Sequence, residues 1–259
     1  MKQFSRHIKL PGFGVEGQKK LSKSKILIIG AGGLGSPAAT YLVAAGAGTL
    51  GIVDNDDVDI SNLPRQILHT PATIDQPKVI SARKRINELN PNIKLNTYHE
   101  NFNAENALKI IRNYDLVIDC TDNFSAKFLI NDACVIAGLT LVHAGVLRYN
   151  GQVMTIIPKK KTACYRCVFN QPPSSDTVPT CSEAGILNTV AGIIGLVQAT
   201  EAIKYVVGLG GILTNRLFVF DALAMQCRTV HISHNNNCPV CGSDPSIKTL
   251  EDIEYNKRC

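Results

Sequence analysis

The chain has 259 residues and a formal net charge of +6, and it is 45% hydrophobic and 19% charged. This length and composition suit a globular protein with a full core and exclude a disordered or fibrous one. Because no apolar signal segment opens the sequence and polar residues interrupt every long apolar stretch, we expect a cytoplasmic protein with no membrane partner. The scattered basic residues lack interleaved aromatic residues, so no nucleic-acid partner is expected.

Short apolar strands alternate with helical segments along most of the chain. The predicted strands are 25–29, 49–53, 94–98, 116–119, 141–146, 151–157, 217–221 and 227–232. The predicted helices are 36–45, 77–89, 104–112, 123–138 with Gly138 as C-cap, and a long helix within 186–207. The alternation predicts an α/β fold with a doubly wound, Rossmann-like and mainly parallel sheet, which the C-terminal strands extend into a mixed sheet.

A glycine-rich turn separates the first strand from the helix at 36–45. Its glycines are Gly30, Gly32, Gly33 and Gly35. Such a turn lets the backbone approach a phosphate, and the helix that follows presents free amides and its positive dipole end to the anion. Asp54, at the end of the next strand, is placed to accept ribose hydroxyls. On these residues alone, an NAD-dependent Rossmann oxidoreductase is the favoured interpretation.

The polar residues that follow Asp54 do not suit hydride transfer. Those at strand and helix ends are Asp56, Asn62, Arg65, Gln66, Lys78, Asp122 and Asn123. Basic side chains near phosphates suit a triphosphate whose charge shifts during reaction, and an aspartate after a strand suits Mg²⁺. Each residue alone is more often a surface charge. Their gathering at strand ends, where doubly wound sheets bind ligands, favours a nucleotide site.

Two Cys-x-x-Cys pairs lie in the second half of the chain, Cys164 with Cys167 and Cys238 with Cys241. A two-residue gap places both thiolates on one metal ion, and two pairs complete a tetrahedral zinc site of structural type. A redox role is disfavoured because neither pair begins a helix after a strand in a thioredoxin-like unit. His231 and His234 are expected to be bystanders, since four cysteines already fill the site.

The other cysteines are interpreted separately. Cys181 lies in a long, polar, proline-rich loop at 171–185, where an incidental thiol and a nucleophile or acyl acceptor fit the sequence equally well. Cys120, Cys134 and Cys227 fall in apolar strands or helices, so we expect all three in the core.

Together these motifs resemble the ThiF/MoeB/HesA family, relatives of ubiquitin-activating enzymes, over nearly the whole chain. They are Gly30-Ala-Gly-Gly-Leu-Gly35, Asp54-x-Asp56, Ser61-Asn-Leu-x-Arg-Gln66, Gln76-Pro-Lys78, Asp119-Cys-Thr-Asp-Asn123, Cys164-Tyr-Arg-Cys167 and Thr180-Cys-x-Glu-Ala-Gly185. The resemblance implies ATP-dependent adenylation of the C-terminal glycine of a small ubiquitin-like sulfur carrier ending in Gly-Gly. Such carriers serve thiamine-thiazole or molybdopterin synthesis.

The resemblance also implies residue roles. Asp54 would hold the ribose, Arg65 and Lys78 the phosphates with Asn62 beside them, and Asp122 the Mg²⁺ ion. Arg6 would reach the triphosphate of a neighbouring subunit, which implies a homodimer. The four paired cysteines would bind Zn²⁺, and Cys181 matches a loop cysteine that links to the activated carrier in some relatives.

Two features depart from the family pattern. Pro64 stands where many relatives carry glutamine, and we expect it to stiffen the loop without removing a contact. The sequence ends at Cys259 without an appended sulfurtransferase domain, so we expect a separate sulfur donor such as a cysteine desulfurase or rhodanese.

Three alternatives remain beside carrier adenylation. The NAD-dependent oxidoreductase is disfavoured by the loop from residue 55 to residue 66. A non-catalytic, zinc-stabilised docking scaffold would need degraded phosphate-binding residues, whereas Arg6, Arg65, Lys78 and Asp122 are all present. Activation of a peptide or a tRNA base is disfavoured because relatives that act on tRNA often lack the loop cysteine and the zinc pairs.

We interpret the chain as one domain in four parts. Residues 1–24 form a helical arm, 25–158 the nucleotide-binding part, and 246–259 a polar tail. Residues 159–245 hold the crossover loop, the carrier-binding strands and the zinc knuckle.

Overall fold

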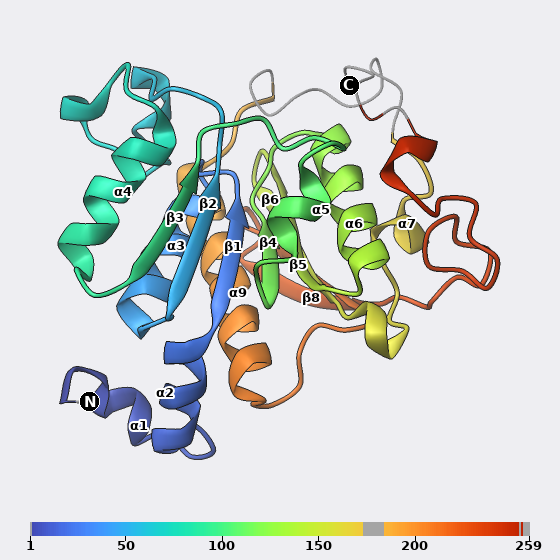
Figure 1. Cartoon of the computed structure of the whole chain (residues 1–259), viewed down its shortest axis with the longest axis horizontal. Helices are drawn as coiled ribbons and strands as arrows, with labels where there is room; N and C mark the ends of the chain where they lie inside the picture. Colours follow the sequence, from blue (N-terminus) through green and yellow to red (C-terminus); the bar gives the residue numbers. More distant parts are fainter. Residues whose placement is uncertain (1, 173–183, 254, 256–259) are drawn as a thin grey trace.

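A single eight-stranded sheet organises the protein, in the order β3-β2-β1-β4-β5-β6-β7-β8. The computed structural model describes residues 2–172, 184–253 and 255 (Figure 1). The strands are β1 (Lys25–Ile29), β2 (Thr49–Val53), β3 (Lys94–Tyr98), β4 (Leu116–Asp119), β5 (Thr140–Leu147), β6 (Asn150–Ile156), β7 (Arg216–Asp221) and β8 (Gln226–His231). The strands from β3 to β5 are parallel, and β6, β7 and β8 continue the sheet antiparallel. The predicted Rossmann-like, mixed α/β fold is confirmed.

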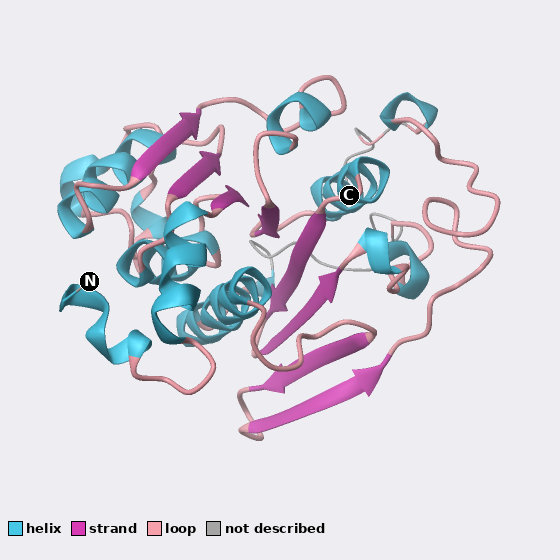
Figure 2. Cartoon of the chain, turned by 60° about the horizontal axis from the view of Figure 1, so that its bottom comes forward, coloured by secondary structure: helices cyan, strands magenta, loops and turns pink. Residues whose placement is uncertain are grey.

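Helices cover both faces of the parallel part of the sheet. One face carries α2 (Gly14–Lys23), α3 (Gly35–Ala45), α4 (Lys78–Leu89) and α9 (Asn188–Val207), with α1 (Ser5–Ile8) and η1 (Lys2–Phe4) beside α2. The other face carries α5 (Ala107–Ile111), α6 (Phe124–Ala137) and α7 (Tyr165–Val168). Single-turn helices are η2 (Ile60–Asn62), η3 (Pro71–Thr73), η4 (Pro158–Lys160) and η5 (Leu250–Asp252). Figure 2 shows β7 and β8 reaching beyond these helices.

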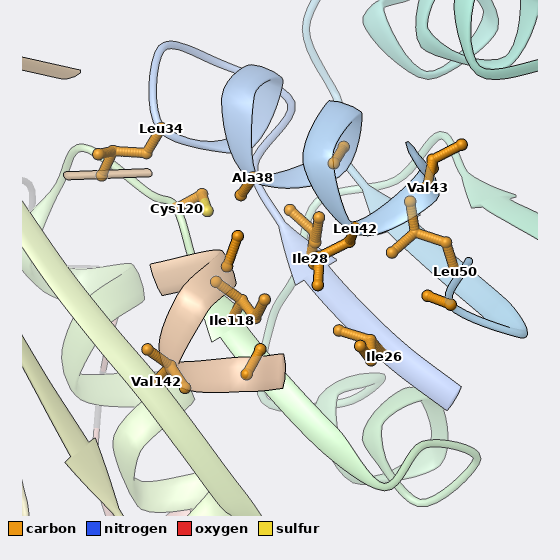
Figure 3. Packing of buried hydrophobic residues seen from close by; sticks show 14 of the residues in the cluster. Ile26, Ile28, Leu34, Ala38, Leu42, Val43, Leu50, Ile118, Cys120 and Val142 are labelled. Atoms are coloured by element: carbon orange, nitrogen blue, oxygen red, sulfur yellow. The ribbon is translucent and has the colours of Figure 1, made fainter. Parts of the chain in front are cut away.

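Two hydrophobic cores follow from the alternation of side chains along the strands. Ile26 and Ile28 of β1 face α3 and α9, where they pack in the same core as Leu42 (Figure 3). Leu27 and Ile29 of the same strand point to the opposite core, under α5 and α6. Because β1 and β4 are buried on both faces, they carry continuous apolar runs, which is the pattern that made them recognisable in the sequence.

The long helix α9 crosses the first core and carries two buried polar side chains. Gln198 donates from Nε2 to the carbonyl oxygens of Asp119 and Val142. Glu201 accepts from the Thr155 hydroxyl at 2.7 Å and from the Leu213 amide. By length and composition α9 could cross a membrane, but half of that apolar window is buried inside the protein. Buried and fully paired polar groups fit a helix of the protein core.

Helix α6 has the ends that its sequence predicts. Asn123 is the N-cap, with its Oδ1 accepting from the Ala126 amide at 2.8 Å. Gly138 is the C-cap in the left-handed conformation at φ +66°, as expected. The predicted helix at 104–112 is shorter in the structure and begins at Ala107. Asn103 causes this difference, because its side chain accepts from the amides of residues 105 and 106 and holds a turn there.

One expectation about the periphery is wrong, and two are refined. The N-terminal segment predicted as a helical arm forms two α-helices, and Leu21 of the second, α2, packs into the first core. Within the predicted polar tail, the described residues Ile247 and Leu250 are buried in the second core. Cys120 and Cys134 are buried as expected, whereas Cys227 is exposed because β8 is an edge strand without a helix over it.

Candidate active site and metal centre

The glycine turn lies between β1 and α3 and is packed tightly against the end of β4. Gly30 has φ +99°, and a Cβ there would come within 2.7 Å of the Cys120 carbonyl oxygen. A Cβ on Gly35 would overlap the carbonyl oxygen of Gly30. Within the described part of the chain, the amides of Gly32 and Gly33 have no acceptor. Free amides ahead of a helix form a site suited to a phosphate group.

Asp54 joins this turn to the loop that follows β2. Its Oδ2 accepts from the Ala31 amide at 2.7 Å, and its Oδ1 accepts from the Asp56 amide at 2.9 Å. Each carboxylate oxygen keeps a further lone pair, so ribose hydroxyls can still bind there. Burial raises the pKa of Asp54, with the positive charge of Lys78 acting in the opposite direction.

Lys78 and Asp56 meet because two short segments of this loop pair with each other. The Lys78 amide donates to the Asp56 carbonyl oxygen, and Asp57 forms an antiparallel bridge with Pro77. The buried Lys78 Nζ lies 2.7 Å from Oδ2 of the exposed Asp56. A buried ammonium at the start of α4 with one exposed partner is suited to exchange that partner for a phosphate oxygen.

The segment from Asn62 to Gln66 lies over the glycine turn. The Arg65 stem lies about 3.5 Å from where a Cβ of Gly33 would stand, and its Nη1 donates to the Ser61 carbonyl oxygen. Asn62 completes a capping box with Asp59 at η2. Gln66 is buried, and its Oε1 has no partner among the described residues. An unpaired buried amide at this turn fits a site that completes its hydrogen bonds with a ligand.

The chain around Pro64 is tied to α9. The Pro64 carbonyl oxygen accepts from Asn188 Nδ2 at 3.0 Å, so the departure from the family pattern at residue 64 keeps an ordered contact. The other half of the site follows β4, where Thr121 lies beside Gly30. Asp122 and Asn123 come next at this edge of the sheet, both exposed.

One residue named by the resemblance, Arg6, is not brought to this edge, and another is not described by the structure. Arg6 lies on α1, which packs at the opposite end of the sheet, where Phe4 touches Gly46 after the C-terminus of α3. Figure 1 shows α1 below the sheet, while the glycine turn follows the upper end of β1. Cys181 lies outside the described residues. The roles proposed for all these side chains stay predictions.

The four paired cysteines form one cluster on the α6 face of the sheet. Their Sγ atoms all lie within 4.8 Å of one another, and separations include 3.4 Å for Cys167–Cys241 and 3.6 Å for Cys164–Cys238. A tetrahedral ion with metal–sulfur bonds of about 2.3 Å requires sulfur atoms about 3.8 Å apart, so the geometry fits a four-thiolate centre. His234 bonds the Cys241 carbonyl oxygen from Nε2 and stands outside the cluster, as expected.

A buried ion pair that the sequence did not reveal holds this centre against α6. Asp132 of α6 accepts from Nε and Nη2 of Arg166, which lies between the first two cysteines, at 2.7–3.0 Å. The hydroxyl of Tyr255 donates to the same carboxylate at 2.7 Å. Neighbouring Asn131 accepts from the Tyr165 amide. The first cysteine pair is thereby fixed by a bidentate, charge-assisted contact.

His69 is a second residue that sequence reasoning missed. Its buried ring joins the glycine turn to α4, with Nε2 donating to the Ala31 carbonyl oxygen at 3.0 Å and Nδ1 lying 2.9 Å from the Ser81 hydroxyl. Burial lowers its pKa, so the neutral ring predominates near pH 7. In the sequence, only its position three residues after Gln66 indicated that His69 could belong to the site.

Fold and site together define a Rossmann-like α/β protein with a nucleotide-type glycine turn and a four-cysteine centre. The ThiF family model matches residues 4–240, and the chain belongs to this family.

Curated relatives agree with this membership, and a solved structure agrees with the fold. The sulfur carrier protein adenylyltransferase of Thermus thermophilus is 40% identical over 97% of this chain and 94% of that protein. The maize adenylyltransferase and sulfurtransferase MOCS3-1 is 46% identical, but this chain spans only 54% of its length. The structure of Escherichia coli MccB with ATP has a TM-score of 0.81 at 23% identity, covering 93% of this chain and 73% of that one. At that identity it supports the fold alone.

Stability should fall as the pH is lowered from about 7.5 to 5.5, and His69→Gln should weaken that dependence. Because burial lowers the pKa of folded His69 below its ordinary value near 6.5, the unfolded chain binds more protons below that pH. In urea denaturation across this range, the dependence of the unfolding free energy on pH should be smaller in His69→Gln than in wild type, by up to about 1.4 kcal/mol per pH unit. The matched change at His99, His99→Gln, is the control for losing an imidazole, because the His99 side chain is exposed. A wild-type slope in His69→Gln would contradict the assignment.

Proposed function

We propose that this protein is an ATP-dependent adenylyltransferase that activates the C-terminal glycine of a small ubiquitin-like sulfur carrier ending in Gly-Gly. The observation that carries the proposal is the single cluster of Asp54, Lys78 and Arg65 around the glycine turn, in a chain whose ThiF match runs through it. The Thermus relative named for this activity supports the same choice. ThiF membership speaks against the NAD-dependent oxidoreductase alternative.

In the proposed reaction, a carboxylate oxygen of the carrier attacks the α-phosphorus of ATP. The new oxygen–phosphorus bond forms as the bond to the bridging oxygen breaks, and pyrophosphate leaves with that electron pair. No protein nucleophile is needed, because the chain supplies position and charge. The amides of Gly32 and Gly33 cradle a phosphate group, Arg65 and Lys78 offset charge on the phosphates, and Asp54 holds the ribose.

A magnesium ion bound with ATP would supply further charge compensation, and Asp122 would hold it. An exposed carboxylate at the carboxyl end of a parallel strand is a suitable oxygen ligand. The ion expected at the four-cysteine cluster is zinc, because thiolate ligands at tetrahedral spacing favour it. Its role there is structural, since four protein ligands leave no open position.

The proposed working unit is a homodimer in which Arg6 completes the site of the neighbouring subunit. Arg6 lies on α1, at the far end of the sheet from its own glycine turn, so a role at the triphosphate requires a second copy. The carrier serves either molybdopterin or thiamine-thiazole synthesis, and a sulfur donor such as a cysteine desulfurase or rhodanese supplies the sulfur. The relatives named MOCS3 combine adenylyltransferase and sulfurtransferase in one protein.

Carrier-dependent ATP–pyrophosphate exchange should occur, and Asp122→Ala should reduce it at least about 100-fold by removing the proposed metal ligand. Purified carriers of the two pathways, each ending in Gly-Gly, should be assayed separately, and the carrier that supports exchange identifies the pathway. Asp115→Ala, at the exposed amino end of the same strand, is the matched control and should keep exchange. Full activity of Asp122→Ala would refute the magnesium role, and no exchange with any carrier would refute the proposed function.

Mixing Arg6→Ala with Asp122→Ala should restore activity that neither variant has alone. A mixed dimer holds one site with an intact Asp122 and an Arg6 from its partner, so random reassortment gives about a quarter of wild-type exchange. Mixing Lys78→Ala with Asp122→Ala is the control, because both residues belong to one site and no dimer gains an intact one. Absence of recovery in the first mixture would contradict a role in the neighbouring subunit.

The purified protein should contain one zinc ion per chain by elemental analysis. Cys238→Ser should lose the metal and lower the melting temperature, because metal binding stabilises only the folded chain. Cys227→Ser removes an exposed thiol outside the cluster and should keep both the metal and the melting temperature. Retention of zinc in Cys238→Ser would exclude the four-thiolate centre.

A further inference from the structure

A buried polar cluster lies at the end of β4, directly beneath the candidate active site. Asp119 is fully buried at the position where β4 pairs with β1 and β5. Its Oδ2 lies 2.8 Å from Nδ1 of His143 on β5 and 3.3 Å from Nζ of Lys127 on α6. Both partners are themselves buried. None of these three side chains has a role in the proposed reaction.

The cluster buries charged side chains at a position that apolar residues could fill. Burial by itself raises the pKa of Asp119, but Lys127 and His143 more than offset this, so its pKa stays well below its ordinary value. Lys127 is held in turn, since its Nζ donates to the Ala144 carbonyl oxygen at 2.6 Å. Removing two charges from water costs several kcal/mol, and a buried pair is often no more stable than an apolar substitute. Stability alone therefore gives no reason for the cluster.

The other carboxylate oxygen of Asp119, Oδ1, fixes the backbone of the residues that follow β4. Oδ1 accepts from both the amide of Thr121 at 2.9 Å and its hydroxyl at 2.6 Å. Two residues later, Asn123 is fixed as the N-cap of α6. Asp122 is thus the single residue between two anchored neighbours, so its backbone has little freedom. The carbonyl of Asp119 is also fixed, by Gln198 of α9.

We propose that Asp119, held by Lys127 and His143, is a positioning residue that sets the conformation of the Thr121–Asn123 segment and aims Asp122 at the nucleotide. This inference rests on the proposed function and deepens it. Asp119 touches no substrate; it acts through Thr121. Because errors of about 1 Å in position can cost about 100-fold in rate, loosening this segment should affect catalysis more than stability.

The sharpest test removes one hydroxyl. Thr121→Val keeps the shape of the side chain and loses the donor to Asp119, whereas Thr121→Ser keeps that donor. In the exchange assay, Thr121→Val should lower kcat about 10-fold with KM for ATP changed less than about threefold, and Thr121→Ser should restore kcat. The melting temperature of Thr121→Val should drop by only about 2–4 °C. Thr200→Val, which removes an exposed hydroxyl of α9, should change neither quantity.

Hydrogen–deuterium exchange provides a readout that does not depend on the reaction. A peptide covering residues 119–124 should exchange faster in Thr121→Val than in wild type or Thr121→Ser, while peptides of β1 and α9 stay protected. If the wild-type protein shows no pyrophosphate exchange, the proposed function fails, and this measurement still decides whether Asp119 orders the segment. Wild-type kcat together with wild-type hydrogen exchange in Thr121→Val would overturn the inference. A lower melting temperature with unchanged kcat would also overturn it, since it would leave Asp119 only a structural role.

A second variant removes the carboxylate without stranding a buried ammonium. Asp119→Leu/Lys127→Met replaces the two charged members of the cluster by apolar groups of similar size, a change that often preserves stability, although His143 loses its acceptor. If the folded double variant still has low kcat and fast exchange at residues 119–124, the positioning role is supported. If it turns over like wild type, that role is refuted. If it does not fold, the comparison of Thr121→Val with Thr121→Ser decides whether Asp119 has a positioning role.

Discussion

The parallel register of β1, β2 and β4 is the constraint on which the site depends. Ile29, the last residue of β1, pairs with Val53 at the end of β2 and with Asp119 at the end of β4. The three strands therefore end at one level, and the segments after them meet there. Gly30 can lie against Cys120 only because neither strand overshoots the other and glycine carries no side chain. The candidate site therefore forms at this edge because the three strands end at the same level.

The polar side chains at this edge connect separate segments of the chain to one another. Asp54 ties the glycine turn to the next loop, and His69 ties the same turn to α4. Lys78 pairs with Asp56 where the two ends of the loop between β2 and α4 meet. Each of these side chains is held by another segment of the candidate site, so the geometry of that site is set before any ligand arrives. Such preorganisation reduces the reordering that binding or reaction would otherwise require.

Local sequence signals predicted the strands, most helix ends and the metal-binding character of each Cys-x-x-Cys pair, because each depends on neighbours within a few residues. Gly138 and Asn123 show this, since capping chemistry needs no distant partner. Long-range partners could not be read in the same way. Asp132 and Arg166 are 34 residues apart, and the residues around either one do not indicate that it pairs with the other. Asp119 stood inside a recognised motif, but its partners Lys127 and His143 become visible only once β4, β5 and α6 are packed together.

The two cores give the four-cysteine centre its place in this scheme. The centre belongs to the core under α6, while the glycine turn borders the core under α3 and α9. His143 connects the centre to the end of β4, because it bonds Asp119 and packs at a tilt against Tyr165, next to Cys164, with the ring centres 4.3 Å apart. α6 does the same, carrying Lys127 at its start and Asp132 further along. A metal bound by the first cysteine pair would therefore also brace the helix and strand that hold Asp119, so a structural ion would support the proposed catalysis without contacting the nucleotide.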